Sequence, residues 1–183
     1  HAHADQTHGI NDLRVFFLKN KKKIDIYSDK ITGNYLKNNF SYCFKKSLAY
    51  PITLKLNTIE KKIKFNDGKE KLSIESIPVK HGLIECLSFI INKNYAYASD
   101  INLIYKNDLS KFKGLKYFIV DCLRYSKHPA HFNLNDVLEL VKILKPNKTI
   151  LTNLHTDLDY NYLLKILPNN VIPAFDGLTF NIK

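Results

Sequence analysis

HAHADQTHGINDLR, residues 1–14, opens the chain and sets His1, His3 and Asp5 at alternating positions. In an extended backbone, alternate side chains point the same way, so two imidazoles and a carboxylate would converge on one point. Neutral imidazole and carboxylate suit zinc, manganese or iron, and no cysteine lies nearby to complete a structural zinc site. The stretch therefore predicts a metal-ligand cluster.

The residues that follow favour a folded segment over a histidine-rich tag or a solvated terminus. Apolar Ile10, Leu13, Phe16 and Phe17 recur at helical spacing. This spacing predicts a helix that buries one face. The ligand cluster would then lie at a helix N-terminus, which also attracts anions such as phosphate.

Composition predicts one domain, residues 1–183, because 183 residues with 45% apolar content can bury one core. The formal charge is +11, but 26 lysines against two arginines are spread along the chain. A basic balance usually favours a polyanionic partner, and the even spread weakens that inference here. Only KNKKK at 19–23 is compact, and it is typical of a solvated helix end.

Cysteine usage and hydropathy predict a cytoplasmic protein without a membrane span. Cys43, Cys86 and Cys122 are odd in number and far apart, so neither a disulfide framework nor a zinc ribbon fits. No stretch approaches the roughly 20 apolar residues of a membrane span, and no signal peptide is visible.

Strands and helices alternate along the rest of the chain, which indicates an α/β fold. Strands are expected at 24–28, 116–122 and 149–154. A helix capped by Ser28 and Asp29 is expected to run through 35–40, and further helices are expected at 135–145 and 159–168. Hairpins are expected for 61–65 with 71–79 through Asn66, Asp67 and Gly68, for 88–92 with 95–99, and for 171–175 with 178–182 around Asp176 and Gly177. His81, Asp100 and His155 each come at or just past the end of a predicted strand, where ligands from distant sequence can meet.

HxHxD followed at once by a helix resembles the metal-binding motif of the metallo-β-lactamase fold hydrolases. The run HAHADQTHGINDLR is similar to the branch of phosphoribosyl cyclic phosphodiesterases from phosphonate breakdown. The resemblance implies an αββα four-layer sandwich and β-strands ahead of the motif that this chain lacks. Because the chain contains no methionine and opens inside the motif, we expect a fragment or a processed product.

The same resemblance implies a site with two divalent metal ions, zinc or manganese. Its ligands would be His1, His3 and His81 for one ion, Asp5 and His155 for the other, and Asp100 bridging the two. Two ions about 3.5 to 4 Å apart can hold a hydroxide at neutral pH and stabilise the entering and leaving oxygens of a phosphoryl displacement. Asp5 and His131 are the expected catalytic residues.

Gln6 departs from the family pattern, which has histidine there. An amide oxygen is a poorer ligand than imidazole, so the second ion should bind more weakly or prefer oxygen, as manganese does. His8 lies three residues after Asp5 and offers a substitute ligand, proton shuttle or substrate contact. A role for His8 outside the metal shell, as a helix cap, is the open alternative.

The segment DCLRYSKHPAHF, residues 121–132, supplies further candidates. The family has a histidine in the corresponding loop, so His131 is the expected general acid, and a surface histidine is the alternative. His128 has no assigned role, since Pro129 argues against a helical HxxH pair. Arg124 in this loop is the candidate phosphate-binding residue, whereas an internal ion pair is expected for Arg14.

The expected function is metal-dependent hydrolysis of a small cyclic ribose or nucleotide phosphodiester. The alternatives are an RNA-processing nuclease of the same fold and a non-catalytic metal-binding protein weakened by Gln6. RNA is the less favoured partner because no basic Gly/Pro-rich arm is visible, no membrane partner is expected, and a homodimer stays open.

Overall fold

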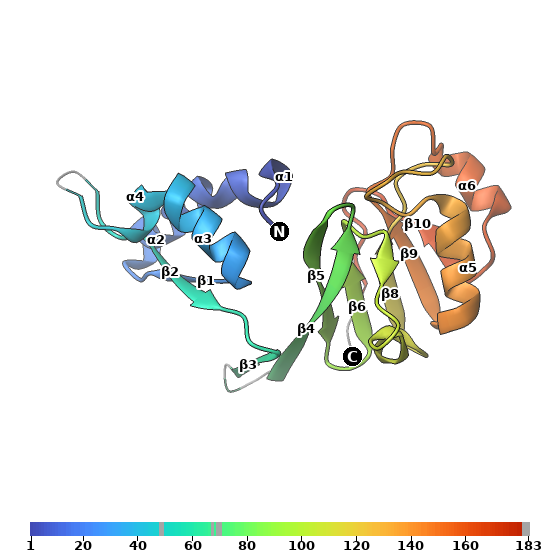
Figure 1. Cartoon of the computed structure of the whole chain (residues 1–183), viewed down its shortest axis with the longest axis horizontal. Helices are drawn as coiled ribbons and strands as arrows, with labels where there is room; N and C mark the ends of the chain where they lie inside the picture. Colours follow the sequence, from blue (N-terminus) through green and yellow to red (C-terminus); the bar gives the residue numbers. More distant parts are fainter. Residues whose placement is uncertain (48–49, 67, 69–70, 181–183) are drawn as a thin grey trace. The chain divides into compact units, whose positions relative to one another are not determined.

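The computed structural model describes residues 1–47, 50–66, 68 and 71–180. Contacts divide the chain into two compact units, His1–Lys61 and Lys62–Lys183, which are drawn in Figure 1 and treated separately below. The expectation of a single domain over residues 1–183 stays a prediction.

The first unit packs five short helices with a two-stranded parallel sheet. Its helices are α1 (Ala4–Thr7), the 3-10 helix η1 (His8–Leu13), α2 (Arg14–Asn20), α3 (Lys30–Asn39) and α4 (Ser41–Phe44), and its strands are β1 (Ile24–Ser28) and β2 (Leu54–Thr58). The predicted strand at 24–28 and the helix through 35–40 are confirmed. Asp29 begins α3 by accepting a hydrogen bond from the Thr32 backbone N–H at 2.9 Å.

The predicted amphipathic helix after the HxHxD motif forms, but its buried face differs from the prediction. Ile10 is buried and Phe16 is 57% exposed. Residues 8–13 form a 3-10 helix with about 3.0 residues per turn, so the 3.6-residue periodicity assumed between Ile10 and Phe16 does not hold.

Arg14 was expected in an internal ion pair, and this prediction is wrong. Its guanidinium carbon lies 4.9 Å from the centre of the Tyr50 ring, a cation-π contact. Within the described ranges no carboxylate lies at ion-pair distance from Arg14.

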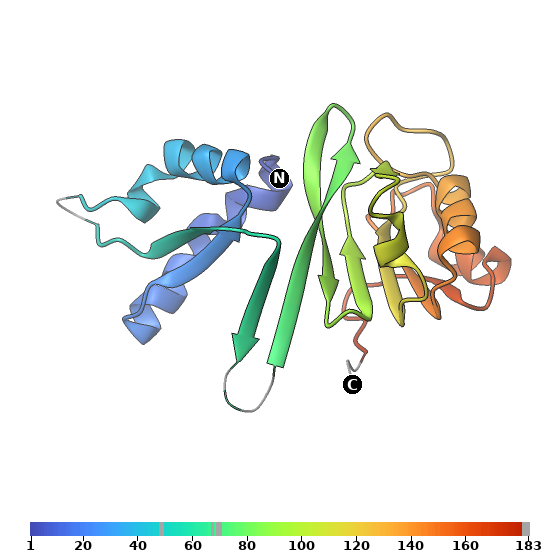
Figure 2. The same ribbon diagram turned by 60° about the horizontal axis from the view of Figure 1, so that its bottom comes forward.

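The second unit is built on one mixed sheet with the strand order β10-β9-β8-β6-β5-β4-β3, and β7 pairs with β4 (Figure 2). The bounds are β3 Lys62–Asn66, β4 Lys71–His81, β5 Ile84–Ile91, β6 Tyr95–Ala98, β7 Leu103–Ile104, β8 Tyr117–Asp121, β9 Lys148–Thr152 and β10 Val171–Pro173. Neighbours from β3 to β6 are antiparallel, and those from β6 to β10 are parallel.

Most predicted strands of this unit are confirmed. The β3–β4 and β5–β6 hairpins pair as expected, and the apolar runs at 116–122 and 149–154 are the buried strands β8 and β9. In the first turn, Asn66 Oδ1 accepts a hydrogen bond from the Gly68 N–H at 3.0 Å, while Asp67 lies outside the described residues.

Helices α5 (Leu134–Leu144) and α6 (Tyr160–Ile166) lie on the same side of this sheet (Figure 1). Asn133 begins α5 by accepting a hydrogen bond from the Asp136 N–H, and the helix ends at Lys145, in a left-handed conformation before Pro146. Val137, Val141 and Leu144 of α5 pack into the buried core with Phe118 and Val120 of β8. This core holds the sheet edge that carries the candidate site.

The closing hairpin predicted for 171–175 with 178–182 is wrong over its described part. Strand β10 pairs in parallel with β9, and residues 174–180 contain no strand, while 181 and 182 lie outside the described residues. The turn itself forms, because Leu178 N–H donates to Phe175 O at 3.0 Å. After it, the Phe180 ring stacks on Tyr117 of β8, with ring centres 4.6 Å apart.

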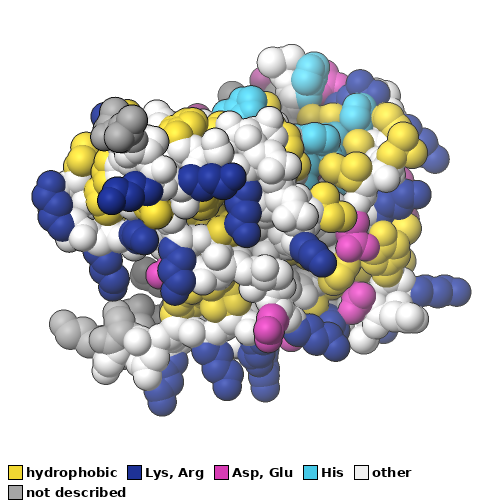
Figure 3. All heavy atoms as spheres, turned by 60° about the vertical axis from the view of Figure 1, so that its left-hand side comes forward, with side chains coloured by type: hydrophobic (Ala, Val, Ile, Leu, Met, Phe, Trp, Pro, Cys, Tyr) yellow, Lys and Arg dark blue, Asp and Glu magenta, His cyan; other side chains and the backbone are white. Residues whose placement is uncertain are grey.

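The cysteines are free thiols and the basic side chains are dispersed (Figure 3), as the sequence predicts. Cys43, Cys86 and Cys122 are free thiols and all are buried. Lysine and arginine side chains are scattered over the face drawn in Figure 3. Within the described ranges, no helix combines the length and apolar character needed to cross a membrane.

Candidate metal centre

Three chain segments of the second unit reach the same edge of the sheet with polar side chains. Since β4 and β6 are both antiparallel to β5, and β6 is parallel to β8, the carboxyl ends of β4, β6 and β8 lie at one edge. His81 is the last residue of β4, Asp100 follows β6 by two residues, and Asp121 is the last residue of β8. The topology therefore gathers polar groups that are far apart in sequence.

His81, Asp100 and His131 form a compact cluster at this edge. One potential ligand atom of each residue lies within 4.8 Å of those of the other two. His81 and Asp100 are each 3% exposed, and the His131 side chain is 17% exposed. Two predicted ligands and the predicted general acid thus meet in one partly enclosed place.

The His81 ring is held by a backbone carbonyl. Its Nδ1 lies 2.7 Å from the carbonyl oxygen of Ala130, which can only accept a hydrogen bond. Nδ1 therefore carries the hydrogen, and in the neutral ring the lone pair lies on Nε2. A hydrogen bond on the other ring nitrogen is the usual way in which proteins orient a metal-binding histidine.

The His131 ring is held by a buried carboxylate that sequence reasoning missed. Its Nδ1 lies 2.5 Å from Oδ2 of Asp121, whose side chain is fully buried. The same Oδ2 accepts a hydrogen bond from the Ile101 N–H at 3.0 Å. The His81 and His131 rings lie edge to face, with centres 4.7 Å apart.

Burial dominates the electrostatics of Asp121. Its removal from water, together with the nearby Asp100 charge, raises the pKa of Asp121 to about 8, although the Ile101 hydrogen bond opposes the shift. Burial likewise raises the pKa of the adjacent Cys122 thiol to about 12. Cys122 is therefore a packing residue and no thiolate ligand.

Asp100 stands at a sharp bend of the backbone. Its φ is +52°, in the left-handed region that aspartate tolerates better than most residues. Directly after it, the Ile101 carbonyl accepts a hydrogen bond from the Phe132 N–H at 2.8 Å. The bend and this bond join the loop after β6 to the loop that carries His131.

His155 is not part of this cluster. It is exposed, and its Nδ1 lies 3.0 Å from Oδ1 of the neighbouring Asp157. Its backbone N–H donates to Leu123 O at 2.8 Å, which holds the loop after β9 against the end of β8. Its expected role as a metal ligand stays a prediction.

The Arg124 guanidinium donates two hydrogen bonds to backbone carbonyls of its own loop. Nε donates to Ser126 O at 3.3 Å and Nη2 donates to Lys127 O at 2.8 Å. A guanidinium has five N–H groups, so these two bonds leave donors on both Nη1 and Nη2 for the predicted substrate contact. The planar fork suits such a double role, because it presents several donors in fixed directions.

His128 also turns toward the loop. Its Nδ1 accepts a hydrogen bond from the Ala130 N–H at 3.2 Å, and its ring centre lies 5.0 Å from that of His131. Partial burial, with the positive charges of His131 and Arg124, lowers the pKa of His128.

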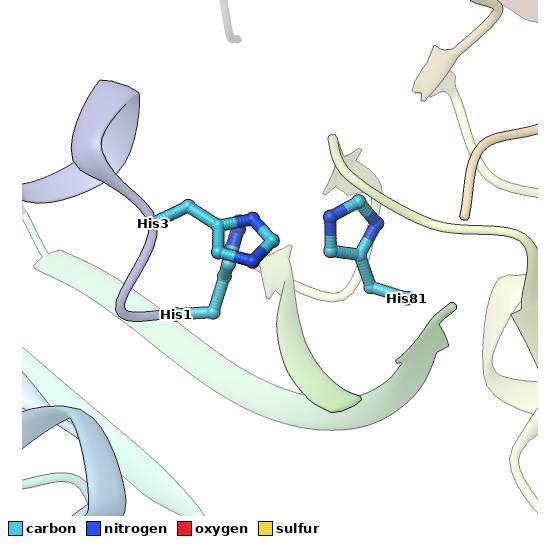
Figure 4. Close-up of side chains that lie close together, drawn as sticks. All are labelled: His1, His3 and His81. Carbon is cyan, nitrogen blue, oxygen red and sulfur yellow. The ribbon is translucent and has the colours of Figure 1, made fainter. Parts of the chain in front are cut away.

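The remaining predicted ligands belong to the first unit. The His1 and His3 rings lie edge to face with centres 4.4 Å apart, ahead of α1 (Figure 4). Asp5 does not continue the expected extended alternation, because α1 begins at Ala4. Gln6 Nε2 donates to Asp5 Oδ2 at 3.3 Å, and the His8 ring packs against Phe40 at 5.7 Å.

The donor set of the cluster fits a divalent metal ion. His81 offers an imidazole whose Nδ1 faces a protein oxygen atom, and Asp100 offers a carboxylate. Nitrogen with oxygen donors suits zinc and manganese. His81, shown in Figure 4 at the end of β4, and Asp100 are the residues that would hold it.

Comparisons with known proteins identify the fold and the family of the chain. A search of curated proteins gave no match. Among solved structures, the chain is similar to a diphosphatase from the PhnP family, with 25% identity and a TM-score of 0.84 over 97% of this chain and 66% of that one. The chain thus spans about two thirds of the length of that relative.

Two more distant structures share the fold. Human tRNase Z, short form, is 13% identical with a TM-score of 0.68, covering 100% of this chain and 77% of that one. Zinc-bound PqqB from Methylobacterium extorquens is 13% identical with a TM-score of 0.69, covering 93% of this chain and 68% of that one.

A family model described as the beta-lactamase superfamily domain matches residues 1–153. The chain therefore belongs to this superfamily of hydrolases, and its mixed-sheet α/β structure is the metallo-β-lactamase fold, as the opening motif predicted.

Proposed function

We propose that the protein is a metal-dependent phosphodiesterase that hydrolyses a small cyclic ribose or nucleotide phosphodiester. The observation that carries the proposal is the cluster of His81, Asp100 and His131, which combines metal-binding donors with an acid-base group. The similarity to a PhnP-family diphosphatase supports a phosphate ester or anhydride as the substrate.

His81 and Asp100 would hold a divalent ion, and the proposed second ion would complete the two-metal site expected from the family. Divalent ions at such a site polarise phosphoryl oxygens and lower the pKa of water. The other proposed ligands are His1, His3, Asp5 and His155, with Gln6 and His8 as further candidates. The proposed metals are zinc and manganese.

His131 would donate a proton to the leaving oxygen. Asp121 faces its Nδ1, so proton transfer would take place at Nε2, as in hydrolases whose histidine is oriented by a carboxylate. Asp5 is the second proposed catalytic residue. Arg124 would bind a phosphoryl oxygen through its other guanidinium N–H groups while Nε and Nη2 hold the loop.

The test uses the full chain loaded with zinc or with manganese. Metal content is measured together with hydrolysis of a cyclic ribose phosphate and of bis(p-nitrophenyl) phosphate. We expect His3→Ala, His81→Ala and Asp100→Asn to lose metal and activity while the far-ultraviolet circular dichroism spectrum stays unchanged. Asp25→Asn is the matched carboxylate control, since Asp25 is exposed and contacts Asn57 and Lys55. Unchanged metal content in Asp100→Asn would refute the assignment.

The substrate class is tested against two alternatives on the same protein. Cleavage of a nucleoside diphosphate but not of the cyclic ester would favour a diphosphatase, the activity of the similar structure. RNA binding that weakens steeply between low and moderate salt would favour a nuclease, since phosphate contacts release counterions. One tightly bound ion without hydrolysis of any of these compounds would favour a non-catalytic metal-binding protein.

A further inference from the structure

Asp121 occupies a central position among the loops of the cluster. Its Oδ2 lies 2.5 Å from His131 Nδ1 and 3.0 Å from the Ile101 backbone nitrogen, the residue after Asp100. One oxygen atom thus contacts both the ring of the proposed general acid and the loop of a proposed ligand. We propose that Asp121 is a positioning residue that sets the tautomer and orientation of His131 and fixes the Asp100 bend.

The contacts around Asp121 form a closed ring. Ile101 N–H donates to Asp121, Phe132 N–H donates to the Ile101 carbonyl at 2.8 Å, and Phe132 follows His131 directly. Movement of His131 therefore moves the Asp100 loop unless one of these bonds breaks. A single fully buried carboxylate couples two members of the cluster.

The free-energy cost of burying the Asp121 carboxylate favours a functional role for it over a role in core packing. Oδ1 of Asp121 is buried and has no hydrogen-bond partner among the residues that the structure describes. Burying an unpaired polar atom is unfavourable, and an aliphatic side chain would fill this core position without that penalty. Phe118 and Val120, on the opposite face of β8, are fully buried apolar residues, so the strand that carries Asp121 lies in the core.

The chemical consequence concerns the two ring nitrogens of His131. With the carboxylate ionised and the ring neutral, Nδ1–H donates to Asp121 and the lone pair lies on Nε2. Without an acceptor at Nδ1, the ring is released to take the other tautomer. Only the catalytic consequence of this inference rests on the proposed function, because the tautomer is a property of the metal-free protein.

The test measures the nitrogen-15 shifts of His131 in the metal-free full chain at about pH 9, where imidazole is neutral. In the wild type we expect the Nδ1–H tautomer. Asp121→Asn should keep it, because an amide oxygen still accepts the bond, whereas Asp121→Leu should shift His131 toward Nε2–H. Val120→Ala perturbs the same strand on the face opposite to Asp121, and it should leave the tautomer unchanged.

The second readout is zinc affinity by competition with a chelator. We expect Asp121→Leu to bind zinc about 10- to 100-fold more weakly than the wild type, with Asp121→Asn between the two and Val120→Ala equal to the wild type. An unchanged tautomer in Asp121→Leu, or an equal change in Val120→Ala, would overturn the proposal. Absence of phosphodiesterase activity with the expected tautomer pattern would count against the proposed function alone.

Discussion

The side-chain oxygen of Asn102 accepts a hydrogen bond from the Gly82 backbone N–H at 3.0 Å. The side-chain nitrogen of Asn102 donates to the Pro129 carbonyl at 2.9 Å. Gly82 follows His81, Asn102 follows Asp100 by two residues, and Pro129 precedes His131 by two. One amide therefore joins the three loops that carry the cluster.

Removing this amide should loosen the cluster without changing any of its members. We expect Asn102→Leu to lower the free energy of unfolding by about 1–3 kcal/mol, because the Gly82 N–H loses its partner in a partly buried place. Zinc affinity should fall as well. Chemical denaturation and chelator competition measure the two effects.

The matched control is Asn39→Leu, which removes an exposed asparagine whose Nδ2 donates to the Tyr35 carbonyl within α3. It should leave zinc affinity unchanged. Equal zinc affinity in Asn102→Leu and the wild type would show that Asn102 is not needed to hold the loops together.

Gly82 combines a backbone and a packing requirement. Its φ is +60°, and an added Cβ would lie 3.0 Å from the Ala130 Cβ. Ala130 also supplies the carbonyl that holds His81. We expect Gly82→Ala to lower the free energy of unfolding by about 1–2 kcal/mol from backbone strain and to weaken zinc binding through displacement of Ala130.

Gly114→Ala separates the two contributions. Gly114 has a nearly equal φ of +62°, and its added Cβ would meet nothing within 4 Å. It should lose stability through strain and keep zinc affinity. If Gly82→Ala also kept full zinc affinity, the contact with Ala130 would be irrelevant to the site.

Local sequence signals explain how much of this site could be predicted. Long apolar or alternating runs placed β4 and β6 correctly, and the resemblance to the family then singled out His81 and Asp100 near the ends of these strands as candidate ligands. Asp121 was missed because it lies inside the apolar strand predicted at 116–122, where no local pattern marks a single carboxylate as functional. Its importance arises from contacts with Ile101 and His131, which depend on strand order.

The C-terminal hairpin was wrongly predicted because its pairing also depends on strand order. Asp176 and Gly177 do form a turn, which is a local property. The partner of β10 is β9, and parallel pairing between β9 and β10 leaves no turn signature in the sequence. Similarly, the HxHxD alternation implied an extended backbone, whereas a helix begins at Ala4.

The pKa of Asp121 predicts how stability changes with pH in the metal-free protein. Burial raises the pKa of Asp121 from its ordinary value of 3.8 to about 8. Between pH 4 and 8 the folded state therefore keeps a proton that the unfolded chain releases, so the free energy of unfolding should fall as the pH rises. The slope from this one proton is at most about 1.4 kcal/mol per pH unit.

Denaturation in the presence of a chelator across this pH range measures the slope. Asp121→Asn cannot titrate, so its profile should be flatter than that of the wild type. Identical slopes for the two proteins would contradict the raised pKa.

Arg124 should not tolerate replacement by lysine. The guanidinium holds the carbonyls of Ser126 and Lys127 with two nitrogens, and an ammonium group cannot reproduce that planar arrangement. With a cyclic phosphodiester that the wild type hydrolyses, we expect kcat/KM to fall about 10-fold in Arg124→Lys, equivalent to about 1.4 kcal/mol. Backbone amides of residues 126–128 should exchange hydrogen faster, because the loop loses two bonds.

Arg14→Lys is the control, since Arg14 is the other arginine of the chain and lies over the Tyr50 ring. It should keep wild-type kcat/KM. Full activity in Arg124→Lys would mean that Arg124 contributes only its charge, whereas faster exchange with unchanged KM and reduced kcat would assign it to loop ordering without phosphate contact. A raised KM together with faster exchange is the result expected for the double role.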